Sequence, residues 1–344
     1  MVAIDILKFG TSSPADTTPI QKLIKAGYEV QDIIAVIGKT EGNGCVNDFS
    51  RTLAQTVWGP LIPEDAITIF SGGTEGVLSP HVSFVVRSRH DKPTGLVASV
   101  GHTRDIDPWE LGTATHAKTV AETLSSMIGD LNIQPSDVQL VLVKCPLLTS
   151  SKIESSKAAG KQALTSDTYK SMALSRYASA LGIASALGEL AEKEIESSLQ
   201  SGDAWSARAS CSSGAELEDN HIFILASDLD ANSGRLRAIS KPMADAIDAA
   251  VVLDLLSRVR QERGEVVQIF AKAEADPRGL IRGTRHTMNT DSDIQSTRHA
   301  RAAVGGLLAG LTGDTQIYVS GGAEGQGAPG GGSLCVVYRC SEQA

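Results

Sequence analysis

Ser71-Gly72-Gly73-Thr74-Glu75-Gly76 is the stretch that decides the fold, because the chain contains it three times. The other copies are Ser212-Ser213-Gly214-Ala215-Glu216-Leu217 and Ser320-Gly321-Gly322-Ala323-Glu324-Gly325. Each copy follows a short apolar or mixed run and precedes a β-rich run, so we expect a β-hairpin at each one. Glycine permits a sharp turn and leaves backbone N–H groups open to a ligand. Three matching neighbourhoods indicate an internal repeat.

Each repeat is expected to contain a strand that ends on a lysine, then a helix that carries an arginine, then the serine motif. The lysine strands are predicted at 33–37, 138–143 and 266–270, followed by Lys39, Lys144 and Lys272. The arginine helices are predicted at 49–58, 172–194 and 294–311, with Arg51, Arg176 and either Arg298 or Arg301. Further strands are predicted at 1–7, 95–100 and 235–240, and further helices at 18–26, 108–128 and 243–260. Cuts near Pro93 and Ser233 give repeats at 1–92, 93–232 and 233–344.

Three such units can close around a pseudo-threefold axis. We therefore predict an α/β fold with a central barrel-like core of strands and helices outside, in which the lysines, arginines and serines converge on one cavity. Burial and neighbouring cations lower the pKa of a lysine from about 10.4, and a neutral amine can deprotonate a serine. Arginine suits a carbonyl oxygen, and backbone N–H groups suit an oxyanion. A single Ser-Gly-Gly is more often a plain turn, but three coincident copies favour a site.

Composition narrows the function classes. The 344 residues are 42% hydrophobic and 21% charged, which fits a globular core, and the net charge of −9 argues against nucleic-acid binding. The chain has no apolar run of membrane-spanning length, and MVAIDILKFG lacks a signal-peptide pattern, so we expect a cytoplasmic protein without a membrane partner. Five cysteines without CxxC spacing are expected to be free thiols. Scattered histidines argue against a catalytic zinc site, and no catalytic cofactor is expected.

Several longer strings resemble the cyanuric acid hydrolase/barbiturase family of ring-opening cyclic amide hydrolases. They are IGKTEGNGCVND at 37–48, SGGTEGVLSPH at 71–81, VKCPLLT at 143–149, AKAEA at 271–275, HTM at 286–288, DSDI at 291–294 and SGGAE at 320–324. The resemblance runs from near the first residues to the final serine motif. It implies three repeats around a pseudo-threefold axis, each with a Ser–Lys pair and an arginine.

The family resemblance implies hydrolytic opening of cyanuric acid to carboxybiuret, which loses carbon dioxide to give biuret. It implies Ser212 as the nucleophile and Lys144 as its base. The implied substrate-binding residues are Lys39, Arg51, Ser71, Gly72, Arg176, Ser213, Lys272, Arg301, Ser320 and Gly321. Arg301 is preferred to Arg298 because it lies 19 residues before Ser320, close to the 20 residues between Arg51 and Ser71.

The resemblance also implies a structural Mg²⁺ or Ca²⁺ ion and a homotetramer. The implied ligands of the ion are Glu274, Ala323, Gln326, Gly327, Ala328 and Gly331, mostly through backbone oxygens, which suit hard cations. The sequence departs from the family pattern at Gly325, Ala328 and Ser213. Ser213 follows the implied nucleophile, so it is a second candidate for contact with substrate or for the attack itself.

Three alternative functions remain open at this stage. The first is a barbiturase, which opens barbituric acid to ureidomalonate; arginine in all three repeats favours cyanurate over this less symmetric ring. The second is a non-catalytic binder of planar cyclic imides, which needs the arginines but not the Ser–Lys pairs. The third is an oligomeric scaffold, which only the apolar helices support.

Overall fold

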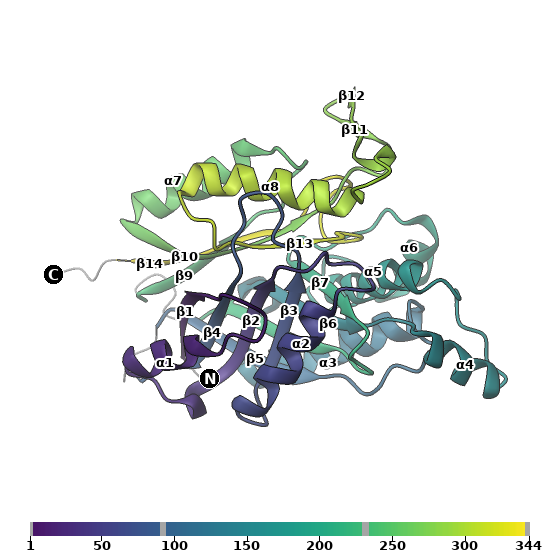
Figure 1. The fold of residues 1–344 in the computed structure, drawn as a ribbon, viewed down its shortest axis with the longest axis horizontal. Helices are drawn as coiled ribbons and strands as arrows, with labels where there is room; N and C mark the ends of the chain where they lie inside the picture. Colours follow the sequence, from purple (N-terminus) through teal and green to yellow (C-terminus); the bar gives the residue numbers. More distant parts are fainter. Residues whose placement is uncertain (1–2, 90–93, 229–233, 341–344) are drawn as a thin grey trace.

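Three four-stranded sheets with the same strand order form the framework of the protein (Figure 1). The computed structural model describes residues 3–89, 94–228 and 234–340. Along the sheets the orders are β1-β4-β2-β3, β5-β8-β6-β7 and β9-β14-β10-β13. In each sheet the last two strands run parallel, and the other neighbours are antiparallel. The same topology in all three sheets supports the repeat inferred from the sequence.

The bounds of the strands follow the three repeats. The first sheet contains β1 (Ile4–Gly10), β2 (Ile33–Thr40), β3 (Ile67–Gly72) and β4 (His81–Arg87). The second contains β5 (Leu96–His102), β6 (Val138–Pro146), β7 (Ala209–Gly214) and β8 (His221–Ser227). The third contains β9 (Leu236–Ser240), β10 (Gly264–Ala273), β13 (Tyr318–Gly321) and β14 (Leu334–Cys340). A small hairpin, β11 (Leu280–Ile281) and β12 (Thr284–Arg285), projects away from the sheets (Figure 1).

Helices cover the outer faces of the sheets. They are α1 (Thr18–Lys25), α2 (Phe49–Trp58), α3 (Ala114–Leu131), α4 (Ser150–Ala158), α5 (Thr168–Ala186), α6 (Ile195–Ser201), α7 (Ala249–Gln261) and α8 (Ser296–Thr312). In Figure 1, α7 and α8 lie side by side over the third sheet. Within the described ranges, no helix has the length and apolar character needed to cross a membrane.

One central core joins the three sheets. It contains the inward side chains of every sheet, for example Ile37, Leu142 and Phe270, each at most 2% exposed. Each sheet also has one outer core, which lies between the sheet and its own helices. Alternate strand residues therefore pack inward and outward, which explains why the inner strands are apolar on both faces. Among the described residues each strand ladder lies within one sheet, and an isolated bridge between Ala3 and Val97 joins the first sheet to the second, so the core is barrel-like without being a closed barrel.

The predicted hairpins at the serine motifs are wrong. β3 and β4 are not neighbours, because β2 lies between them, and the other two repeats share this order. The connection from Gly73 to Pro80 is long enough to step across one strand, whereas a hairpin needs only a short turn. Each serine therefore lies on a strand that is parallel to the lysine strand, and this pairing brings the two residue types together.

Three helices also differ from their predicted bounds. The helix predicted at 108–128 begins only at Ala114, after Gly112, whose φ of +81° interrupts a helix. The helix predicted at 172–194 ends at Ala186, two residues before Gly188 with φ +71°. The helix predicted at 243–260 begins at Ala249, because the Asp248 carboxylate caps it by accepting a hydrogen bond from Val251 N.

The predicted boundaries between the repeats lie outside the described residues. The cuts at 92/93 and 232/233 fall within 90–93 and 229–233. The three sheets span 4–87, 96–227 and 236–340. The division into 1–92, 93–232 and 233–344 therefore stays a prediction.

Candidate active site

Each repeat places a lysine directly opposite a serine on a parallel strand pair. Lys39 on β2 faces Ser71 on β3, and Lys144 on β6 faces Ser212 on β7. Lys272 on β10 faces Ser320 on β13. All three lysines are at most 2% exposed, and the serines are buried as well. The lysine and the serine of each repeat therefore lie side by side at the strand ends.

Two of the three pairs are joined by a direct hydrogen bond. Lys39 Nζ donates to Ser71 Oγ at 3.1 Å, and Lys272 Nζ donates to Ser320 Oγ at 3.1 Å. Ser71 Oγ in turn donates to Ser320 Oγ at 3.2 Å. These four side chains form one continuous buried hydrogen-bond chain across the first and third repeats.

The pair in the second repeat is arranged differently. Lys144 Nζ donates to Phe70 O at 2.8 Å and to Ser213 O at 3.4 Å, and it lies 3.4 Å from a Glu216 carboxylate oxygen. Ser212 Oγ is buried and has no hydrogen-bond partner among the described residues. The Ser212 hydroxyl is therefore uncommitted, in contrast to those of Ser71 and Ser320.

Burial shifts all three lysines towards the neutral amine. Burial, opposed in part by the Glu216 carboxylate, lowers the pKa of Lys144 to about 8. Burial and the charge of Arg176 lower the pKa of Lys272 to about 7. Burial and the charge of Arg301 hold the pKa of Lys39 well below its usual value. Each amine can thus exist uncharged near neutral pH, which a base for a serine requires.

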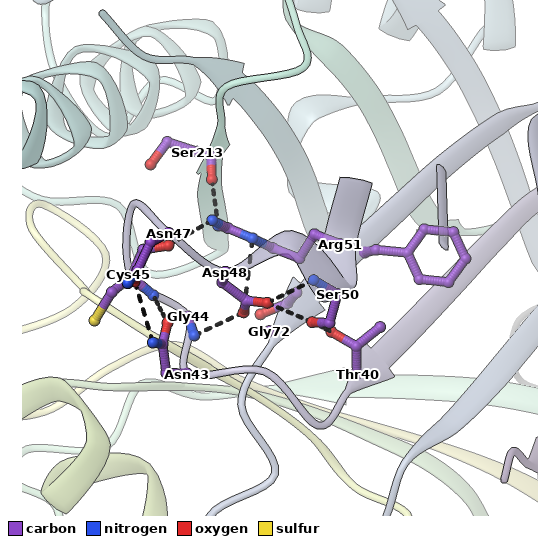
Figure 2. A network of polar contacts seen from close by, with 12 residues as sticks. Thr40, Asn43, Gly44, Cys45, Asn47, Asp48, Ser50, Arg51, Gly72 and Ser213 are labelled. Carbon is purple, nitrogen blue, oxygen red and sulfur yellow. Dashed lines mark hydrogen bonds and ion pairs between the residues drawn. The ribbon is translucent and has the colours of Figure 1, made fainter. Parts of the chain in front are cut away.

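Arg51 reaches from the first repeat into the second, as Figure 2 shows. It lies in the first turn of α2, and its guanidinium donates to Ser213 O at 2.7 Å and to Cys45 O at 2.8 Å. Asp48 caps this helix through Ser50 N at 3.0 Å and lies 3.8 Å from Arg51 Nε. Asp48 therefore both caps the helix and positions the arginine.

The other two arginines continue this pattern around the axis. Arg176, from the second repeat, pairs with Glu324 of the third at 2.7 Å. Arg301, from the third, pairs with Glu75 of the first, and its Nη2 also donates to Asn43 O at 2.9 Å. Each repeat thus contributes an arginine to the loop of the next repeat. Arg298 contacts the same glutamate, but it is partly exposed.

Three glutamates of the site were not predicted from the sequence. Glu75, Glu216 and Glu324 each follow a motif serine by four residues, so the signal was present in the repeated string itself. Glu75 and Glu324 pair with arginines, whereas Glu216 lies beside Lys144. The second copy therefore breaks the symmetry, at the pair whose serine hydroxyl has no partner among the described residues.

One small pocket brings the predicted serines and arginines together. Its lining contains all three motif serines and all three helix arginines, together with Gly44, Gly72, Met172, Ser213 and Gly321. The three lysines are not part of this lining, but each donates a hydrogen bond to a serine strand. Met172, one turn before Arg176 on α5, was not predicted, and it adds an apolar surface on one side only.

Close packing explains the glycines of the motif. A Cβ at Gly73, whose φ is +100°, would lie 2.7 Å from the Arg301 guanidinium. A Cβ at Gly321 would lie 2.4 Å from the same group, so a larger residue here would displace the guanidinium. The equivalent of Gly321 in the second repeat is Ser213, whose hydroxyl accepts from Arg176 Nη1 at 3.2 Å. The second motif therefore adds a polar group to the pocket that the other two lack.

The residues implied for a structural ion lie beside the pocket and fit an oxygen-ligand site in part. Glu274, Ala323 and Gly327 line one groove. Burial and the nearby Glu324 carboxylate raise the pKa of Glu274, and no hydrogen bond to its carboxylate is found among the described residues. A divalent cation would stabilise the charged form of this partly buried carboxylate. The Gln326 side chain is already bonded to Cys211 N and Gly322 O, so Gln326 fits only through its backbone oxygen.

The fold and the site define a class: an α/β protein with three repeats and buried Ser–Lys pairs around one pocket, an arrangement suited to nucleophilic hydrolysis. The sequence profile of the amidohydrolase ring-opening protein family matches residues 5–339, and the chain belongs to this family. Its members hydrolyse cyclic amides, and this chain is such an enzyme.

Individual relatives match over their full lengths. The cyanuric acid amidohydrolase of Sarocladium sp. is 62% identical, covering 99% of this chain and 100% of the relative. That of Pseudonocardia dioxanivorans is 57% identical, covering 98% and 99%. The crystal structure of the cyanuric acid hydrolase from A. caulinodans superposes with a TM-score of 0.92 at 43% identity, covering 99% and 100%. The predicted family and fold class are confirmed.

Proposed function

We propose that this protein is a cyanuric acid amidohydrolase that opens the ring of cyanuric acid to carboxybiuret, which then loses carbon dioxide to give biuret. Cyanuric acid has three equivalent carbonyls, and three serines and three arginines line one pocket. This matched set of donors is the observation that carries the proposal. The names of the relatives at 62% and 57% identity support it.

In the proposed mechanism, neutral Lys144 takes the proton of Ser212, and the alkoxide attacks a ring carbonyl carbon. The carbonyl electrons move to oxygen, and guanidinium and backbone N–H groups stabilise the tetrahedral intermediate. Its collapse breaks the ring C–N bond, and the leaving nitrogen receives the proton from the Lys144 ammonium. Water, deprotonated by Lys144, then hydrolyses the ester at Ser212 and restores the serine. The remaining two Ser–Lys pairs bind and orient the ring.

The environment of the three hydroxyls supports Ser212. Ser71 and Ser320 both accept a hydrogen bond from a lysine, whereas Ser212 Oγ has no partner among the described residues. Ser71 Oγ already donates its proton to Ser320 Oγ, so this proton is not directed at a lysine amine. Ser71 is an alternative nucleophile, because Lys39 is bonded directly to it. Ser213, which follows Ser212 in the chain, is a further alternative.

Single serine substitutions test this assignment. Ser212→Ala is expected to reduce kcat by at least about a thousandfold, as expected for the loss of a nucleophile, with measurable cyanurate binding retained. Ser71→Ala, Ser213→Ala and Ser320→Ala are the matched controls, and each should retain a larger kcat. Loss of turnover confined to Ser71→Ala or Ser213→Ala would move the nucleophile to that residue.

A substrate comparison tests the function itself. Ring opening should be measured with cyanurate and with barbiturate on the same preparation. Turnover of barbiturate alone, giving ureidomalonate, would identify a barbiturase and overturn the proposal. Binding of cyanurate without turnover would identify a binder of planar cyclic imides.

We also propose that Glu274 holds a structural Mg²⁺ or Ca²⁺ ion together with oxygens of Ala323, Gln326, Gly327, Ala328 and Gly331. The support is the partly buried Glu274 carboxylate, whose pKa burial and the nearby Glu324 carboxylate raise. The ion would neutralise this carboxylate and the neighbouring Glu324, and so hold Arg176 in place through its partner. It has no role in the proposed chemical steps.

A further inference from the structure

Two histidines and an aspartate lie together at one end of the second sheet, outside the lining of the serine pocket. His102 is the last residue of β5 and His221 the first of β8, and they are direct cross-strand partners. Asp219 precedes β8 by two residues. Directly opposed side chains on antiparallel strands lie on the same face with Cβ atoms about 5 Å apart. The fold therefore assembles this group from segments far apart in the sequence.

The ligand atoms of the three side chains already point at one another. His102 Nδ1 lies 2.8 Å from Asp219 Oδ2, and His221 Nε2 lies 3.3 Å from Asp219 Oδ1. One ligand atom from each residue lies within 4.8 Å of the others. Tetrahedral Zn²⁺ holds imidazole nitrogen and carboxylate oxygen at about 2.1 Å, which places ligand atoms roughly 3.4 Å apart. Only small side-chain movements would bring the three into that geometry.

The backbone behind the group is held firmly. Asn220, between the aspartate and the second histidine, donates from its backbone N to Thr103 Oγ1 at 3.0 Å and from its side chain to the same oxygen at 3.2 Å. Thr103 N donates back to Asn220 O at 3.0 Å. The two segments that carry the ligands are thus bonded to each other. Such preorganisation reduces the entropy cost of binding an ion.

We propose that His102, Asp219 and His221 form a binding site for one divalent transition-metal ion, Zn²⁺ in particular, with water at the fourth position. The side chains of Asp219 and His221 are 18% and 12% exposed, so they form the fixed part of the site. His102 is 49% exposed and gives the ion access from solvent. In the first sheet, Gly10 occupies the place opposite His81, so that repeat lacks the histidine pair.

The position of the site gives it a structural role. His221 is the register partner of Lys144, one strand away, and the connection that bears Asp219 also bears Glu216. An ion there ties the edge strand β5 to the segment that follows Ser212. Because the ion binds only the folded chain, it raises the melting temperature as its concentration rises. This inference is independent of which cyclic amide the enzyme opens.

Zinc stoichiometry tests the proposal on the full chain without an affinity tag. Equilibrium dialysis with Zn²⁺, in excess Mg²⁺ to occupy oxygen-ligand sites, should show one ion more per chain for the unaltered protein than for His102→Ala or Asp219→Asn. His299→Ala is the matched control, because His299 pairs with Asp291 at 3.0 Å and no second histidine joins them among the described residues. This control should bind the same amount of Zn²⁺ as the unaltered protein.

Cobalt provides an independent readout. Co²⁺ in place of Zn²⁺ should give visible absorption of a tetrahedral site in the unaltered protein and in His299→Ala, and lose it in His102→Ala. Equal Zn²⁺ stoichiometry in the unaltered protein and in both site variants would overturn the proposal, and so would an equal loss in His299→Ala. Asp219→Asn preserves the shape of the side chain and is expected to fold normally. It therefore tests the site even if His102→Ala is misfolded.

Discussion

Ser212 Oγ has a different environment from the other two motif hydroxyls, although all three serines occupy equivalent strand positions. The difference comes from neighbouring residues. Glu216 lies beside Lys144, whereas Glu75 and Glu324 pair with arginines. The Lys, Arg and Ser of the second repeat therefore differ chemically from those of the other two, because the motif glutamate contacts the lysine there and an arginine elsewhere.

The charge of Glu216 should set the pH range of activity. Because this carboxylate raises the pKa of Lys144 against the effect of burial, Glu216→Gln should lower that pKa below about 8. The amine then becomes neutral at lower pH, so the acidic limb of the kcat/KM profile should move to lower pH. Glu218→Gln, a change at a nearby exposed glutamate paired with Lys152, should leave the limb in place. An unmoved limb in Glu216→Gln would show that Lys144 is not the titrating base.

Part of the site could be predicted from residue patterns. The lysines, serines and arginines recur in every repeat, so their convergence followed from the repeat alone. The glutamate partners recur as well, but their roles depend on which side chain each one meets. Met172 and the commitment of Ser71 to Ser320 come from packing across repeats, which no local pattern contains.

At the scale of elements, α2 shows how a helix start aims an arginine. The Asp48 carboxylate accepts from Ser50 N at 3.0 Å and from Gly44 N at 2.8 Å, and it lies beside Arg51 (Figure 2). One side chain thus fixes the helix start, the preceding loop and the guanidinium. The cap was predictable from the sequence, because aspartate before an amphipathic run is a typical start signal.

Asp48→Ala should affect both stability and substrate binding. Loss of the cap is expected to cost about 1–2 kcal/mol of unfolding free energy, and release of Arg51 should raise KM. Urea unfolding and steady-state kinetics measure the two effects. Asp248→Ala is the control: it removes a similarly buried cap from α7, which bears no pocket arginine, so it should lower stability without raising KM. Equal effects on KM would contradict the positioning role of Asp48.

The strand order was the main error of the sequence reading. Strand–turn–strand patterns predicted hairpins, yet β2, β6 and β10 lie between the strands that flank each serine motif. Periodicity identifies strands but does not rank their neighbours, because neighbours are chosen by packing of the whole sheet. Lysine and serine face each other because their strands are parallel neighbours. The sequence predicted that the two residues pair, but not that they do so across parallel strands.

At the scale of the whole molecule, an ion at Glu274 would link parts of the third repeat to Arg176 of the second. Mg²⁺ should raise the melting temperature of the unaltered protein, by an amount equivalent to about 2.7 kcal/mol at a hundred times its Kd. Glu274→Gln should abolish this response, whereas Glu265→Gln, at an exposed position of the same strand, should preserve it. A Mg²⁺ response that survives in Glu274→Gln would place the ion elsewhere.

The predicted homotetramer is tested by mass in solution. Light scattering coupled to size-exclusion chromatography should give four times the 36.0 kDa of the chain. Exposed apolar side chains such as Phe49 and Leu164, 76% and 56% exposed, are the surfaces that assembly would cover. A mass of 36.0 kDa across the working concentration range would exclude the tetramer.

Two of the buried lysine amines donate a hydrogen bond to a backbone carbonyl of the preceding repeat. Lys144 donates to Phe70 O, and Lys272 donates to Cys211 O. Their positions are therefore set by how the sheets dock against one another, as much as by their own strands. A compound that moved the second sheet slightly away from both of its neighbours would displace both amines together. Such a compound would silence the enzyme from outside the central pocket, without resembling a triazine ring.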